Sequence, residues 1–152
     1  MDRRKRIRLG PSAYGSSYVF SVTIATQGRG DIFRDISFGL DCIYILRVLR
    51  RESGCPIYAY CLMPDHVHLL VGTSAKTPLP RFVGAWKSRC YRAGRLRGYV
   101  DPFWQRSFYD HAIRADEDLR VAARYVLANP VRAGLVSDFR LYPLCGSMEF
   151  EI

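Results

Sequence analysis

Hydrophobic and polar residues follow two different periods along this chain, and together they predict alternating strands and helices. Apolar runs rich in aromatic and β-branched residues are typical of strands, and apolar residues three or four positions apart are typical of helices. The expected strands cover residues 18–26, 57–63, 65–73 and 103–114. The expected helices cover residues 37–53, 78–97 and 116–128.

The order of these elements predicts the fold. Strand, helix, strand, strand, helix, strand and a final helix is the α+β, ferredoxin-like split βαβ pattern. We expect an antiparallel sheet of four to five strands with helices on one face, plus a C-terminal helix. A chain of 152 residues is long enough for one core. We therefore expect a single domain over residues 18–143, between an arm at 1–17 and a tail at 144–152.

Two histidines lie in the third expected strand. Alternate strand residues point to the same face, so His66 and His68 project side by side with Cα atoms about 6.6 Å apart. Both imidazoles could then bind one metal ion, at roughly 2.0–2.1 Å per bond for zinc. Val67 and Leu69 point the other way, into a core. Two polar residues on a half-exposed strand explain the spacing equally well, so it does not decide alone.

Charge points to an anionic partner. The formal net charge is +9, from 23 Lys and Arg against 14 Asp and Glu, which is typical of proteins that bind nucleic acid or a membrane surface. One basic cluster lies in the N-terminal arm and another follows one face of the second helix. Their members are Arg3, Arg4, Lys5, Arg6, Lys87, Arg89, Arg92, Arg95 and Arg97. A single sign of charge suits a phosphate backbone, although a solvated tail and a solvated helix face remain the alternatives.

Targeting signals and cysteine spacing limit the other function classes. No signal peptide or run long enough to span a bilayer is present, so we expect a cytoplasmic protein without membrane contact. The five cysteines are odd in number and show no Cys-x-x-Cys spacing. We therefore expect reduced thiols, neither a disulfide framework nor a zinc cluster.

One of the ten tyrosines stands apart by its position on the last helix. Leu119, Ala123 and Val126 form the stripe expected to pack on the sheet. At about 100° per residue, Tyr125 lies more than 90° away from that stripe. Tyr125 and Asn129 are four residues apart and can address the same point in space. The alternative is an ordinary half-buried helix tyrosine.

Several motifs together resemble a known family. The runs are Met-Pro-Asp-His-Val-His-Leu-Leu at 63–70, Trp-Gln at 104–105, His-Ala-Ile-Arg at 111–114 and Asn-Pro-Val-Arg-Ala-Gly-Leu-Val at 129–136. In this order they closely resemble the HUH single-stranded DNA nucleases with one catalytic tyrosine. More narrowly, they resemble the REP-associated tyrosine transposases, relatives of the IS200-type transposases. The resemblance covers roughly residues 18 to 143.

The resemblance implies a mechanism. Tyr125 would be the nucleophile that cleaves single-stranded DNA at hairpin-forming repeats through a 5′-phosphotyrosine link, which a free 3′ hydroxyl later reverses. His66 and His68 would hold a divalent metal, Mg²⁺ or Mn²⁺ by family chemistry, although two imidazoles alone favour zinc or another transition metal. Asn129 would be the third ligand, or instead an N-cap for the turn after it. Asp65 is interpreted as a turn residue, and His111 as a strand residue.

Two other functions remain open at this point. A nucleic-acid-binding regulator could keep the fold without catalysis, although both histidines and the tyrosine are present. A small metallohydrolase would use metal-bound water and form no covalent adduct with DNA. The resemblance also leaves open whether the protein is a monomer or a homodimer that exchanges tyrosine helices.

Overall fold

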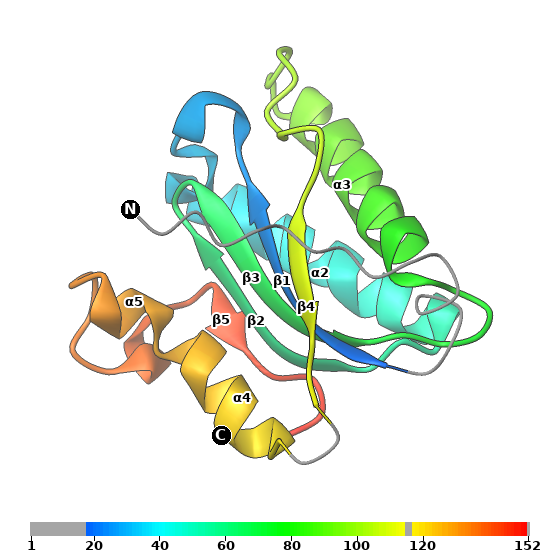
Figure 1. Ribbon diagram of the computed structural model, residues 1–152. Helices are drawn as coiled ribbons and strands as arrows, with labels where there is room; N and C mark the ends of the chain where they lie inside the picture. The colour runs from blue at the N-terminus through cyan, green and yellow to red at the C-terminus, as the bar shows by residue number, and fades with distance from the viewer. Residues whose placement is uncertain (1–17, 115–116, 152) are drawn as a thin grey trace.

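A five-stranded antiparallel sheet is the centre of the computed structural model, which describes residues 18–114 and 117–151 (Figure 1). The sheet order is β4-β1-β3-β2-β5, with every neighbouring pair antiparallel. The strands are β1 (Val19–Ala25), β2 (Ile57–Met63), β3 (His66–Gly72), β4 (Tyr109–Ala112) and β5 (Cys145–Gly146). The first four strands have the order of the split βαβ fold, so the predicted fold class is confirmed.

The β2–β3 hairpin has two faces of different character. Val67, Leu69 and Val71 of β3 lie in the larger core, whereas Leu70 lies in a second, smaller cluster on the other face. The register of β2 against β3 shifts between Ile57 and Ala59. Beyond this irregularity, alternate residues of β2 lie in the same two clusters. Both strands are almost fully buried, which explains their nearly continuous apolar sequence.

Helices α2 (Ile36–Ser53) and α3 (Leu79–Leu96) cover the face with the larger core (Figure 1). The carboxylate of Asp35 caps α2 by accepting a hydrogen bond from the backbone N–H of Phe38, at 3.1 Å. Gly54 ends α2 in the left-handed conformation, at φ 71°. Trp86 of α3 is fully buried and donates its indole N–H to the carbonyl of Cys42, which joins the two helices.

Helix α4 (Leu119–Leu127) packs on the opposite face of the sheet, at the lower left in Figure 1. Ala123 and Val126 are buried against Ala59 and Leu70, which confirms these two members of the predicted stripe, whereas Leu119 is half-buried and outside both clusters. The short helix α5 (Asn129–Arg132) follows after one turn residue, with a proline in its first turn. Gly134 then reverses the chain at φ 74°.

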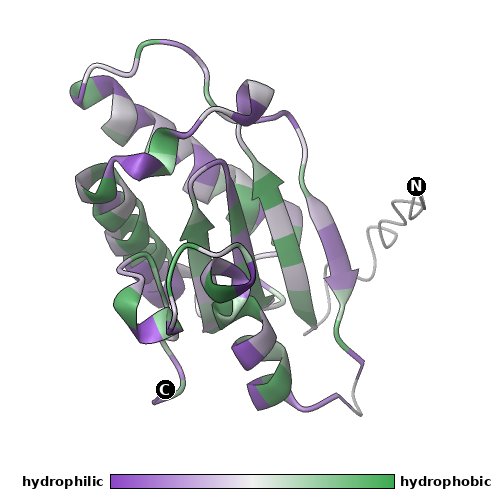
Figure 2. Ribbon diagram, turned by 90° about the vertical axis from the view of Figure 1, so that its left-hand side faces the viewer, coloured by the Kyte–Doolittle hydropathy of each residue, from purple (hydrophilic) through white to green (hydrophobic). Residues whose placement is uncertain are grey.

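The fourth strand is shorter than expected. Residues 103–114 were predicted to be one strand, but only β4 pairs continuously with β1, and Trp104 makes an isolated bridge to Thr26. The rings of Phe103 and Trp104 pack on the larger core. The chain therefore leaves the sheet between the bridge at Trp104 and the start of β4. The edge strand β4 is mostly hydrophilic, and Figure 2 shows it in purple.

The C-terminal residues belong to the packed domain, which corrects the boundary expected at residue 143. Leu144 is fully buried and lies so close to Gly39 that any larger side chain there would collide with it. The carboxylate of Glu149 forms an ion pair with Arg50 and accepts a hydrogen bond from the backbone N–H of Ile57. These contacts over long sequence separations keep the segment on the sheet.

All five cysteines are free thiols. Within residues 18–114 and 117–151, no helix is long and apolar enough to cross a membrane. The basic N-terminal arm with Arg3, Arg4, Lys5 and Arg6 lies outside the described residues.

Replacing Leu144 with alanine tests whether the C-terminal segment contributes to the core. We expect Leu144→Ala to lower the free energy of unfolding by about 2–4 kcal/mol, because it leaves a cavity beside Gly39. Leu141→Ala is the matched control, since Leu141 is 65% exposed and should change stability by less than about 0.5 kcal/mol. Urea denaturation of both variants measures the difference. Equal stabilities would show that residues 144–151 are not part of the cooperative unit.

Candidate active site at the histidine pair

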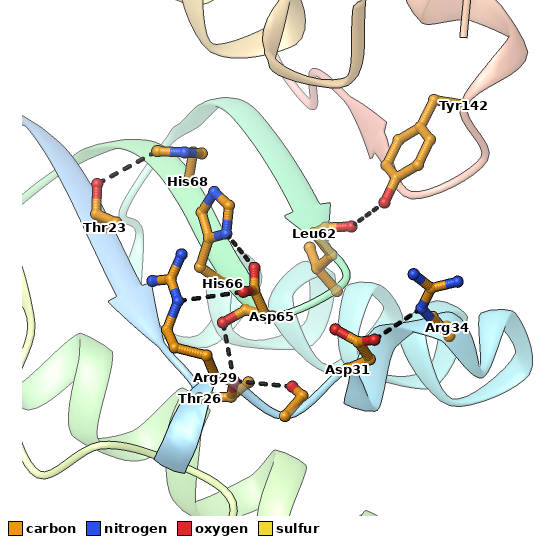
Figure 3. A network of polar contacts seen from close by, with 11 residues as sticks. Thr23, Thr26, Arg29, Asp31, Arg34, Leu62, Asp65, His66, His68 and Tyr142 are labelled. Carbon is orange, nitrogen blue, oxygen red and sulfur yellow. Dashed lines mark hydrogen bonds and ion pairs between the residues drawn. The ribbon is translucent and has the colours of Figure 1, made fainter. Parts of the chain in front are cut away.

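His66 and His68 lie together at the start of β3, on the sheet face that α4 covers (Figure 3). Their ring centroids are 4.8 Å apart and their planes are almost perpendicular, at 88°. Val67 between them is fully buried in the opposite core. The strand period therefore places the two imidazoles side by side, as the sequence predicts.

The turn before β3 holds His66. The carboxylate of Asp65 lies 2.7 Å from Nδ1 of His66, and its other oxygen lies 3.1 Å from the guanidinium of Arg29. Burial alone would raise the pKa of Asp65, but the hydrogen bond to His66 and the charge of Arg29 outweigh it and lower the pKa. A charged carboxylate accepts a hydrogen bond from Nδ1–H and so leaves the Nε2 lone pair of His66 for another partner.

His68 has a similar support on β1. Its Nδ1 lies 3.2 Å from the hydroxyl of Thr23, its register partner on β1. Burial lowers the pKa of His68 to about 4, and the positive charges of His66, Arg132 and Arg29 act in the same direction. His68 is therefore neutral near pH 7, which is the form that binds a metal.

Thr26 and Arg29 position the turn, although nothing in the sequence singled them out. The buried hydroxyl of Thr26 lies 2.9 Å from the carbonyl oxygen of Asp65 and 2.8 Å from that of Gly30 (Figure 3). Arg29 has a left-handed backbone conformation, at φ 57°, which is unusual for a residue other than glycine. Their roles depend on contacts across about forty residues, and a sequence pattern carries no signal for them.

Tyr125 is exposed at the surface of α4, with 69% of its area accessible. Its ring contacts Arg132 of α5, whose guanidinium carbon lies 4.1 Å from the ring centroid. The same guanidinium donates a hydrogen bond of 2.9 Å to the backbone carbonyl of Tyr125. Tyr125 is therefore not an ordinary half-buried helix tyrosine. No hydrogen-bond partner for its hydroxyl occurs among the described residues.

Arg132 relates this tyrosine to the histidines. Its charge is one of the causes of the lowered pKa of His68, so it acts on the histidine pair while its guanidinium covers the Tyr125 ring. Arg29 acts on His68 from the side of the turn. Two arginines thus add positive potential around the imidazoles, which favours an anionic ligand.

Asn129 lies at the start of α5, where the backbone turns away from α4. Its side-chain N–H donates to the carbonyl of Val126 at 2.8 Å and makes no cap bond to α5, so the N-cap interpretation was wrong. The preceding Ala128 remains helical, and the chain therefore needs no cap at this point. This contact leaves the amide oxygen of Asn129 for another partner.

The site offers two strong metal ligands, the imidazoles of His66 and His68. Residues 18–114 and 117–151 contain no group of three or more His, Cys, Asp and Glu side chains that could hold a metal. The two imidazole rings are nevertheless adjacent, with centroids 4.8 Å apart, and both Nδ1 atoms already have oxygen partners. A third protein ligand would therefore be a weaker oxygen donor such as an amide.

The predicted nucleic-acid track on α3 is less free than expected. Arg89 forms an ion pair with Glu52 at 2.8 Å, and Arg97 forms one with Asp41 at 2.7 Å, so two arginines of this face are salt-bridged. Lys87 donates to the carbonyl of Gln105. Acidic residues of α2 lie opposite these arginines, a packing that the charge pattern of α3 alone does not reveal.

The structure also separates this track from the histidines. Helix α3 covers the face opposite His66 and His68. Arg92 is exposed on α3 and has no ion pair among the described residues. His111 is an exposed strand residue, as predicted, and lies on β4, which β1 separates from β3.

Comparison with known proteins gives the family. The sequence model described as "Transposase IS200 like" matches residues 14–129, which include both histidines, Tyr125 and Asn129. A Haemophilus influenzae protein assigned as a REP-associated tyrosine transposase is 31% identical over 146 residues, covering 85% of this chain and 78% of its own length. The Escherichia coli REP-associated tyrosine transposase is 27% identical over 99 residues, covering 62% of this chain and 56% of its own.

Solved structures share the fold. A REP-associated tyrosine transposase bound to a REP hairpin has a TM-score of 0.70 and 20% identity, covering 95% of this chain and 82% of its own. A Deinococcus radiodurans protein assigned as a transposase has a TM-score of 0.51 and 24% identity, covering 81% and 97%. The family model matches most of the chain, and the Haemophilus protein aligns along most of both sequences. The chain therefore belongs to the IS200-like transposase family and is a DNA-cleaving and DNA-rejoining enzyme of it.

Proposed function

We propose that this protein is a metal-dependent endonuclease and strand transferase for single-stranded DNA, acting at hairpin-forming repeats through a 5′-phosphotyrosine intermediate. The observation that carries the proposal is the histidine pair, whose rings are 4.8 Å apart and whose Nδ1 atoms both have oxygen partners, so that both Nε2 atoms remain for a ligand. An exposed tyrosine on the helix that covers the same face supplies the nucleophile.

His66, His68 and the amide oxygen of Asn129 would hold a divalent ion, Mg²⁺ or Mn²⁺. When bound, such an ion supplies positive charge that polarises the scissile phosphate. The residues of the chain prepare this site in advance. Asp65 and Thr23 fix the orientation of the two imidazoles, and burial keeps His68 neutral.

Tyr125 is the proposed nucleophile. A tyrosine side chain has a reference pKa of about 10 and is a weak nucleophile near neutral pH, so its attack depends on charge neutralisation at the phosphate. The phenol oxygen forms a bond to the scissile phosphorus and loses its proton, while the bond to the 3′ oxygen breaks and that oxygen leaves as a hydroxyl. The tyrosine ester keeps the energy of the broken bond, so a later 3′ hydroxyl can reverse the step without ATP.

Arg132 has a positioning role in this scheme. Its guanidinium lies over the Tyr125 ring and bonds to the Tyr125 carbonyl, so one side chain restrains both ring and backbone. Cation–π contacts at exposed sites contribute roughly 0.5–1 kcal/mol, enough to favour one orientation of an exposed ring. This restraint holds the phenol in a defined place before DNA binds.

The proposed DNA substrate follows from charge and from a relative. The net charge of +9 favours a polyanion. The structural relative with the TM-score of 0.70 is bound to a REP hairpin, and we extend this partner to the present chain. Arg92 on α3 and the basic arm at residues 3–6 remain proposed phosphate contacts, on surfaces away from the histidine pair.

Covalent capture tests the nucleophile. We expect wild-type protein with end-labelled hairpin DNA and Mg²⁺ or Mn²⁺ to give a labelled protein–DNA band on a denaturing gel. Tyr125→Phe should abolish this band because the phenol oxygen is the atom that bonds to phosphorus, and His66→Ala should abolish it by removing a metal ligand. Tyr44→Phe is the matched control, since Tyr44 is 67% exposed but lies on α2.

Two outcomes would contradict this mechanism. DNA cleavage that survives in Tyr125→Phe would indicate water or another residue as the nucleophile. DNA binding without cleavage, across several hairpins and both metal ions, would instead favour a regulator on the same fold.

Replacing Asp65 tests the support of the metal site. Asp65→Asn removes the charge that orients His66, and loss of such a supporting carboxylate typically weakens metal binding by about 10–100-fold. Titration calorimetry with Mn²⁺ in the absence of DNA measures this effect. Asp31→Asn, an exposed acid that pairs with Arg34, is the control and should bind as wild type. Wild-type affinity in Asp65→Asn would exclude the proposed support.

The lowered pKa of His68 predicts a dependence of stability on pH. The unfolded chain takes up a proton at this histidine below about pH 6.5, whereas the folded chain does so only near pH 4. The free energy of unfolding should therefore decrease as the pH falls from about 6.5 to 4. His68→Gln should flatten this decrease, as measured by denaturation at several pH values. A decrease of the same size in both proteins would place its origin elsewhere.

A further inference from the structure

A recess lies on the helix that carries Tyr125. It has a volume of about 310 Å³ and separates α4 from the C-terminal segments. Its lining residues, here called the α4 groove, are Arg120, Ala123, Arg124, Phe139, Arg140, Phe150 and Glu151. The mechanism proposed above uses none of them.

The floor of the α4 groove is apolar and rigidly supported. Ala123 is buried, and Phe139 and Phe150 pack against the same hydrophobic cluster as Leu70 of β3. Phe150 also contacts the ring of Tyr58, with ring centroids 5.8 Å apart. Two aromatic rings are thus held at the surface on the sheet face that carries the histidine pair.

Positive charge surrounds this floor. The guanidinium of Arg120 lies 5.0 Å from the centroid of Phe150, and that of Arg140 lies 5.0 Å from the centroid of Phe139. Arg140 also pairs with Asp138, whereas Arg124 has no ion pair among the described residues. The lining also contains one acid, Glu151, against three arginines. The balance still favours an anion.

The position of the groove relates it to the reaction. Arg124 directly precedes Tyr125 in α4, and Arg120 lies one helical turn before Arg124. Neighbouring helix residues point about 100° apart, so Arg124 and Tyr125 lie on adjacent sides of α4. A strand joined to Tyr125 can therefore continue around α4 toward this recess.

We propose that the α4 groove binds one unpaired nucleotide of the DNA strand that flanks the scissile phosphate, with its base on Phe139 or Phe150 and its phosphate beside Arg124. This site rests on the proposed function. Aromatic platforms combined with a cationic groove are how proteins hold single strands. The volume is at the lower end of ligand pockets, roughly 300–1,000 Å³, which suits one nucleotide and excludes a duplex.

Binding measurements on two variants test the site. The probes are a fluorescent hairpin with short single-stranded flanks and the same hairpin without flanks, measured by anisotropy with a chelator present so that no strand is cut. Arg124→Gln and Phe139→Leu should each weaken binding of the flanked hairpin roughly five- to tenfold, in line with the loss of one base stack or phosphate contact. Binding of the hairpin without flanks should stay unchanged.

Arg51→Gln is the matched control because it removes the same charge from an exposed position on α2, on the opposite face. It should weaken both probes equally and only slightly. If Phe139→Leu fails to fold by circular dichroism, the exposed Arg124→Gln variant still decides the result. A flank carrying 5-iodouracil should photo-crosslink to Phe139 or Phe150, as mapped by mass spectrometry.

The outcomes separate the two proposals. If wild-type protein forms the Tyr125 adduct, but the variants bind both probes like Arg51→Gln and no crosslink maps to the groove, the groove is not a nucleotide site and the proposed function stands. If no adduct forms but the flank-dependent loss and the crosslink appear, the groove binds a nucleotide and the cleavage mechanism is wrong. Equal weakening of both probes in Arg124→Gln would also overturn the site, because it would reflect general charge.

Discussion

The two-residue period of β3 is the constraint on which the rest of the site depends. Val67, Leu69 and Val71 are buried under α2 and α3, and burying a side chain of this size stabilises the fold by roughly 1.5–3 kcal/mol each. A shift of one residue would exchange this core for the two histidines, so the register is strongly determined. Core packing on one face therefore fixes the position of chemistry on the other.

Around that strand, the structure supports the histidines before any ligand arrives. Asp65, itself held by Thr26 and Arg29, orients His66, and the β1 hydroxyl of Thr23 orients His68. Burial then keeps His68 neutral despite a positively charged surface. These contacts come from β1, from the loop after it and from the β2–β3 turn, and they convert two adjacent imidazoles into a directed pair.

The second half of the site is attached to the same face by a different kind of packing. Ala123 and Val126 bury one side of α4, which leaves Tyr125 exposed on another side. The turn at Ala128 then brings Arg132 back over the tyrosine ring. The C-terminal segment completes this layer, because Phe139 and Phe150 pack on the cluster beneath α4.

The sequence by itself determined what depends on local periodicity. The order of elements, the side-by-side histidines, the packing stripe of α4 and the exposed Tyr125 all follow from the spacing of apolar residues. Only the tertiary structure decided which residues support them. Thr23, Thr26 and Arg29 reach the histidines across strands, α2 neutralises part of the α3 charge, and Leu144 joins the core. These contacts connect residues about 40 to 100 positions apart, and no short sequence pattern encodes such pairings.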